Sequence, residues 1–235
     1  MTFEDLHIHS TFSDGRGTVR QNLEAARCVG LERIACVDHV RRDTDWVPAF
    51  VHHVRSVARD YPLEVLIGVE AKLLDGGGAV DLPPVLSGVD RVYIADHQFP
   101  VRGGVVKPQL VRRALRTGEL DPDLVVRSLI QATTLAVRHT PYPVVIAHLF
   151  SILPKVGLSE DHVDLRWLDP LIDVALDRGA WIELDERWKC PGSRVAASFA
   201  AAGVPVVLST DAHTSEAIGQ YVWAPTVLES LRAAA

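Results

Sequence analysis

The sequence predicts an α/β fold of the TIM-like (β/α)7 barrel type, formed by a single domain over residues 1–235. Seven short apolar runs recur along the chain, and each is followed by an amphipathic stretch, which is the pattern of strands alternating with helices. The runs are nearly continuous rather than alternating, as expected for parallel strands that are buried on both faces. A length of 235 residues suits one barrel better than two domains.

The seven runs are the predicted strands, at residues 3–8, 33–37, 65–69, 91–95, 144–147, 180–184 and 204–208. Between them, Thr18 and Gln21 form a capping box that starts a helix ending before Gly30. Asp121 is an N-cap ahead of Pro122, which predicts a helix from there to about residue 139. Glycines at positions 179 and 203 end two further helices.

An open Rossmann-type sheet is the alternative architecture. The chain has no Gly-x-Gly-x-x-Gly turn and no acidic residue placed for a dinucleotide ribose, so we favour the barrel. The connection from Gln98 to Pro143 is too long for a simple crossover, and we expect it to cover the barrel mouth.

Composition excludes several classes of protein. Hydrophobic residues make up 48% and charged residues 23%, and there are only three cysteines, which excludes disorder and a disulfide scaffold. The net charge of −6 leaves no global positive field for nucleic acid, which disfavours a nucleic-acid partner without excluding one. The sequence shows no signal peptide and no apolar stretch near 18 residues, so we expect no membrane partner and a cytoplasmic location.

Six of the ten histidines lie at or just beyond the C-terminal ends of predicted strands: His7, His9, His39, His97, His148 and His213. Three acidic residues follow the same pattern, since Glu70 ends the third strand, Asp14 follows the first and Asp211 follows the last. In parallel barrels the strand C-termini ring one face, so these nine side chains should converge on one pocket.

Imidazole and carboxylate donors without a convergent cysteine favour Zn, Mn or Fe. A lone histidine at a strand end is more often a packing residue than a ligand, but nine matching positions favour a metal centre. The remaining histidines, His52, His53, His139 and His162, lie in helical stretches and are interpreted as surface residues.

The motifs resemble, in order, those of the PHP (polymerase and histidinol phosphatase) superfamily. They are His-Ile-His-Ser-Thr-Phe-Ser-Asp-Gly (7–15), Val-Asp-His (37–39), Gly-Val-Glu (68–70), Ala-Asp-His (95–97), Ala-His (147–148) and Ser-Thr-Asp-Ala-His (209–213). The resemblance implies a distorted (β/α)7 barrel with two to three divalent transition metals.

By the same resemblance, the nine donors divide into three groups. The first metal would be held by His7, His9, Glu70 and Asp211; the second by Glu70, His97 and His148; and the third by Asp14, His39 and His213. Two departures from the family pattern are an aspartate at position 14, where some members have histidine, and Leu149, where proline is common.

The resemblance implies hydrolysis of a small phosphomonoester, as in histidinol phosphatases, by a hydroxide that bridges the metals and without a side-chain nucleophile. Three divalent ions would make the mouth positive in an acidic protein and so attract a phosphate dianion. Arg187 and Lys189 follow the sixth strand and are candidates to bind the phosphate, although solvated loop charges are an equal interpretation.

Three competing functions remain. A PHP-type phosphodiesterase or nuclease is the main alternative, and five tryptophans leave base stacking open. An amidohydrolase would be expected to carry a bridging lysine where Glu70 and His97 stand, and a catalytically silent scaffold would be expected to have lost ligands. The sequence leaves the oligomeric state open.

Overall fold

The computed structural model describes residues 3–233, and its centre is a seven-stranded sheet in which all neighbouring strands run parallel. The strand order is β1-β2-β3-β4-β7-β8-β9. The strands are β1 (Glu4–Ile8), β2 (Arg33–His39), β3 (Glu64–Lys72), β4 (Arg91–Ala95), β7 (Val144–Ile146), β8 (Trp181–Asp185) and β9 (Val206–Ser209). The prediction of seven strands is confirmed, with bounds that differ by at most three residues.

The sheet curls until its two edges meet. A parallel bridge joins Ile8 to Ala212, and Ala212 exchanges backbone hydrogen bonds of 2.8 and 3.1 Å with His9 and His7. Asp5 reinforces this seam by accepting from the backbone and the hydroxyl of Thr210 at 2.9 and 2.6 Å. The predicted barrel is therefore confirmed. Its closure beside β1 rests on a single bridge, whereas every other pair of neighbouring strands in the barrel is joined at two or more residues.

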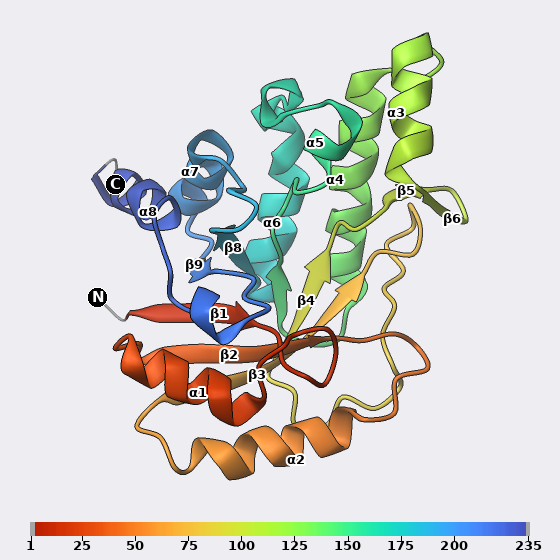
Figure 1. Cartoon of the computed structure of the whole chain (residues 1–235). Coiled ribbons are helices and arrows are strands. Elements are labelled where there is room, and N and C mark those ends of the chain that lie inside the picture. The colour runs from red at the N-terminus through yellow and green to blue at the C-terminus, as the bar shows by residue number, and fades with distance from the viewer. Residues whose placement is uncertain (1–2, 234–235) are drawn as a thin grey trace.

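Helices cover the outside of the barrel, with α1 and α2 below β1–β3 in the view of Figure 1 and α4 to α8 above. They are α1 (Val19–Cys28), α2 (Val47–Ala58), α3 (Pro108–Thr117), α4 (Pro122–His139), α5 (Leu153–Val156), α6 (Asp169–Arg178), α7 (Ser193–Ala202) and α8 (Ala224–Ala233), with short 3-10 turns at Glu160–His162, Leu165–Leu168 and Ser215–Ala217. The capping box at Thr18 and the N-cap at Asp121 are both present. Within residues 3–233, none of the helices combines the length and apolarity needed to cross a membrane.

The barrel interior holds its own small core below the histidines. Its buried members are Leu6, Ala35, Val37, Tyr93, Ala95, Val145, Ala147 and Val207. The Tyr93 ring fills the centre, and a Cβ atom added to Gly68 would lie 2.5 Å from that ring, so this position of β3 requires glycine. Because side chains alternate along a strand, residues two positions beyond this core also point inward, and there they reach the mouth.

The connection after β4 stands beside the mouth rather than over it. It forms the hairpin β5 (Phe99–Val101) and β6 (Gly104–Val106), then α3 and α4, and the hairpin and α3 lie at one side of the molecule (Figure 1). Of its residues, Gln98 alone lines the pocket at the mouth. The expectation of a cap over the mouth is wrong, because the buried face of α4 packs against the barrel as an ordinary crossover helix.

Candidate metal centre

Glu70 is the hub of a histidine cluster at the barrel mouth. The residue is 2% exposed, and its Oε1 lies 3.0 Å from His148 Nε2 and 3.1 Å from His97 Nε2. Its Oε2 lies 2.9 Å from His39 Nδ1 and within 3.5 Å of the Nε2 atoms of His7 and His9. One carboxylate thus contacts five imidazoles, which come from four different strands or strand ends because His7 and His9 both belong to β1 and its end.

The nine predicted donors come together in overlapping groups whose ligand atoms lie within 4.8 Å of one another. The groups are His7, His9 and Asp211; Glu70, His97 and His148; and His9, Asp14, His39 and His213. They follow the three sets implied by the family resemblance with two differences: His9 belongs to the third group as well as the first, and Glu70 belongs to the second group but not to the first. Asp14 lies at the rim, with 56% of its side chain exposed.

Strand periodicity places these side chains. On β2 the inward series Ala35 and Val37 continues to His39, and on β4 the series Tyr93 and Ala95 continues to His97. On β3, Gly68 is followed by Glu70 in the same way. The donors therefore form the top inward layer of the barrel.

Several buried atoms of the cluster have no hydrogen-bond partner among the described residues: His7 Nε2, His9 Nδ1, His9 Nε2 and Glu70 Oε2. Buried polar atoms are rarely left unpaired, because removing them from water without a new partner costs free energy. Imidazole and carboxylate donors that face one another suit divalent transition metals. The residues present therefore fit divalent metal binding.

The protonation of the cluster follows from its mixture of charges. Burial alone would raise the pKa of Glu70, but the neighbouring imidazoles of His148, His39 and His7 hold that pKa well below its usual range. Burial alone would lower the pKa of His7, but Glu183 and Glu70 raise it well above its usual value. Burial dominates at His9 and lowers its pKa, which favours the neutral imidazole that binds metals.

Glu183 and Asp96 fix the imidazoles of His7 and His148 on the side that faces away from the mouth. Glu183 accepts from His7 Nδ1 at 2.8 Å and from the backbone N–H of His148 at 2.7 Å. Asp96 accepts from the hydroxyl of Ser151 at 2.7 Å, and this hydroxyl lies 3.0 Å from His148 Nδ1. Partners of this kind fix the orientation of a ligand histidine and leave its other nitrogen free for a metal.

Sequence reasoning did not identify Glu183 or its inward neighbour Asp185, although His7, Glu183 and Asp185 form a further group of possible donor atoms. The sequence did contain a pattern that could have identified them, because Glu183 and Asp185 are two residues apart in an apolar strand, the same spacing as His7 and His9. Burial raises the pKa of Asp185 well above its usual value, and the neighbouring Glu183 raises it further.

Two of the nine donors sit on unusual backbone. His148 and Asp211 have φ values of 28° and 47°, a region that residues other than glycine rarely adopt. Such conformations persist where surrounding contacts enforce them, and they cluster at functional sites. The bond from His148 N–H to Glu183 is one such contact.

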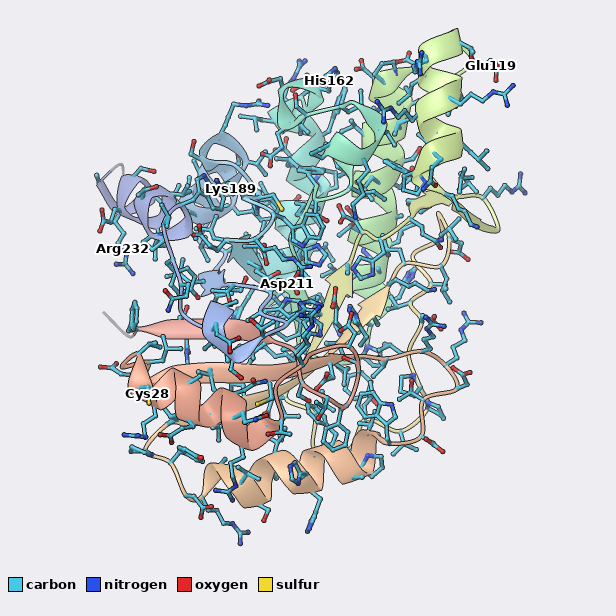
Figure 2. All side chains as sticks on the ribbon, in the orientation of Figure 1. Cys28, Glu119, His162, Lys189, Asp211 and Arg232 are labelled. Atoms are coloured by element: carbon cyan, nitrogen blue, oxygen red, sulfur yellow. The ribbon has the colours of Figure 1, made fainter. Side chains whose placement is uncertain are left out.

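The two predicted phosphate-binding residues differ in position. Arg187 Nη1 lies 3.1 Å from Asp211 Oδ2 and 2.7 Å from His213 Nδ1, so its guanidinium borders the cluster. Lys189 is exposed and lines a separate pocket of about 340 Å³ beside Glu160. In Figure 2, Asp211 lies near the centre of the molecule, whereas Lys189 lies above it and His162 lies at the outer edge.

All four helical histidines are exposed at helices or a 3-10 turn, and none of them belongs to a donor group: His52, His53, His139 and His162.

A pocket of about 620 Å³ opens onto the cluster and exposes Asp14, His39, Glu70 and His97. Its opposite wall comes from the loops after β1 and β2. Asp38 of β2 holds the loop after β1 in place, because it accepts from the backbone and hydroxyl groups of Ser10 and Ser13.

Comparison with known proteins gives one family and several relatives. The family model of the PHP domain matches residues 5–156. A relative named "Phosphoribosyl 1,2-cyclic phosphate 1,2-diphosphodiesterase", from Eggerthella lenta, is 39% identical over 72 residues, which are 31% of this chain and 25% of that relative. The chain therefore matches about a quarter of that relative's length.

A second relative, "Probable histidinol-phosphatase" from Deinococcus radiodurans, is 22% identical over 257 residues, which cover 92% of this chain and 88% of the relative. Among solved structures, a "putative histidinol phosphatase" from Listeria monocytogenes shares the fold with a TM-score of 0.68 and 11% identity, covering 92% of this chain and 97% of that one.

Proposed function

The chain belongs to the PHP domain family, and from this membership we propose that it is a metal-dependent phosphoester hydrolase whose substrate is a small phosphomonoester. The observation that carries the proposal is the set of buried His7, His9 and Glu70 atoms that lack hydrogen-bond partners among the described residues at the barrel mouth. The full-length relative from Deinococcus radiodurans, named as a probable histidinol-phosphatase, supports the reaction class.

The nine donors would hold two to three divalent metals, of which Mn, Fe and Zn suit the ligand chemistry. When bound, such ions lower the pKa of a water toward 7 and offset the charge on the phosphoryl oxygens. Glu70 would link the first and second groups, because its Oε1 faces His97 and His148 while its Oε2 faces the Nε2 atoms of His7 and His9.

Arg187 would bind and orient the phosphate. Its guanidinium borders Asp211 and His213, and 45% of the side chain is exposed toward solvent, so N–H donors remain for a phosphoryl oxygen. Glu183 and Asp96 would keep His7 and His148 fixed while substrate enters.

A monoester should be preferred to a diester. A terminal phosphate would bring nearly two negative charges to the bound metals, whereas a diester brings one charge and a second substituent that the mouth must accommodate. The direct test compares kcat/KM for p-nitrophenyl phosphate and bis-p-nitrophenyl phosphate with the Mn-loaded and then the Zn-loaded protein. Arg187→Ala should weaken the preference for the monoester, because it removes the donor proposed for the phosphate.

A diester rate equal to or above the monoester rate with both metals would favour a phosphodiesterase instead. Hydrolysis of single-stranded oligonucleotides would favour a nuclease. No hydrolysis of any phosphoester by the metal-loaded protein would overturn the proposed function.

A further inference from the structure

Lys72 points into the same pocket as Glu70. Both residues belong to β3, and their separation of two positions places them on the same side of the strand. Both line the 620 Å³ pocket at the mouth, and Lys72 is 30% exposed there. The strand therefore presents a carboxylate to the histidine cluster and, one step further out, an ammonium to the pocket.

Asp81 lies beside this ammonium but does not occupy its hydrogen-bond donors. Asp81 is 8% exposed, and its Oδ1 is already held by the backbone N–H of Arg42 at 3.0 Å. Its Oδ2 lies 3.8 Å from Lys72 Nζ, which is beyond hydrogen-bond distance. The ammonium thus has a fixed neighbour of opposite charge and keeps its donors for a ligand.

The rest of the pocket suits an organic group of modest size. Phe12 and Trp46 line it, with ring centroids 5.6 Å apart, and Trp46 packs edge-on against Phe50. Exposed Arg41 adds a second positive charge at the rim. The pocket therefore has phosphate-binding chemistry at one end, an aromatic wall, and positive charge apart from the histidines.

From this arrangement we infer that the preferred substrate is a phosphomonoester whose leaving group carries a second anionic group, carboxylate or phosphate, bound by Lys72. The inference rests on the proposed function and names the substrate class for that function. A second anion placed near Lys72 gains a charge-assisted hydrogen bond that a neutral analogue lacks.

The test uses aryl phosphates that differ only in the second group. We would measure kcat/KM for phenyl phosphate and for the meta and para isomers of carboxyphenyl phosphate, carbamoylphenyl phosphate and phenylene bisphosphate. A carboxylate or phosphate should raise kcat/KM about tenfold over the neutral carbamoyl group. The carboxylate and bisphosphate arms separate the two sources of the second charge.

The variants locate the effect. Lys72→Gln should reduce the ratio between charged and neutral substrates to near one, and Lys72→Arg should retain part of it. Lys107→Gln, which removes an exposed lysine outside the pocket, should leave the ratio unchanged. A ratio near one in the wild-type protein, or a ratio that survives Lys72→Gln, would overturn the inference while hydrolysis of phenyl phosphate upheld the proposed function.

A binding measurement decides the inference without turnover. Calorimetry of the metal-loaded protein would compare phosphonobenzoate with phosphonobenzamide, two compounds that cannot be hydrolysed as esters. The acid should bind about tenfold more tightly to the wild-type protein and equally to Lys72→Gln. Equal affinities of the acid and the amide for the wild-type protein would contradict the role of Lys72, whatever the hydrolysis assay shows.

Discussion

His7 donates from Nδ1 to Glu183 Oε1 over 2.8 Å, and both side chains are fully buried. The bond orients the His7 ring so that Nε2 faces Glu70 and the mouth. Glu183 also binds the backbone of His148, so one carboxylate positions donors from two strands.

Replacing Glu183 with glutamine should weaken metal binding by about 10- to 100-fold, since the amide is a poorer acceptor for His7. Competition with a chelator would measure the affinity, and circular dichroism would show that the fold is retained. Glu229→Gln, at an exposed position on α8, is the matched control. Unchanged affinity in Glu183→Gln would mean that His7 is oriented by other contacts.

The purified protein should bind more than one equivalent of divalent metal after reconstitution with excess Mn, Fe or Zn. The physical reason is that nine donors in three groups exceed what one ion can use. Elemental analysis gives the stoichiometry. One equivalent or fewer would exclude a multinuclear centre.

Donor and surface histidines should differ sharply in their effect on turnover. His97→Ala or Asp211→Ala removes an atom that faces the cluster and should lower kcat/KM by at least about 100-fold. His52→Ala and His162→Ala change exposed side chains and should alter stability by no more than about 0.5 kcal/mol and activity by less than a few-fold. Equal losses in the two sets would show that the donors are wrongly assigned.

The three thiols should react in two classes. Cys28 is exposed, whereas Cys36 and Cys190 are buried, and burial raises the pKa of both buried thiols. A thiol reagent such as Ellman's reagent should therefore modify one equivalent in the native protein and three after unfolding. Cys28→Ser should remove the native reaction, and rapid modification of two thiols in the folded wild-type protein would contradict this packing.

Glu160 should make stability fall as pH rises. Burial raises the pKa of Glu160 from 4.5 to about 7, against the opposing hydrogen bond from Gly192. Because the folded state then binds the proton more tightly than the unfolded state, the contribution of Glu160 is present at low pH and is lost between these two values. Glu160→Gln keeps an acceptor for Gly192 but cannot titrate.

Urea unfolding at about pH 5 and pH 8 measures this effect. The wild-type protein should lose about 1 kcal/mol more than Glu160→Gln over this range, allowing for the partial exposure of the side chain. Parallel losses in the two proteins would assign the pH dependence to other groups.

Local patterns predicted the strands because each strand is a short apolar run, and the run at 91–95 matches β4 at both ends. The meeting of the nine donors followed from topology, since parallel strands bring their C-terminal ends to one face. These inferences needed only periodicity and chain order.

Features set by long-range packing were not predictable in this way. Arg187 and Lys189 follow the end of β8 by two and four residues, but the turn between them directs Arg187 to Asp211 and Lys189 to a separate pocket. The role of Lys72 depends on Asp81, nine positions later, which folds back beside it. The position of the long connection depended on how α4 packs, which its length alone does not specify.

The β5–β6 hairpin provides a place to attach a label. The space around Gly103, in its turn, is open, because no atom lies within 4 Å of its Cβ position, and its φ of 75° favours keeping the glycine itself beside an insertion. The hairpin lies to one side of the barrel (Figure 1). The entropic cost of a longer turn grows slowly with its length, so an epitope or fluorescent reporter inserted there would add little strain. A protein tethered to a surface through this turn would keep its mouth open to solution.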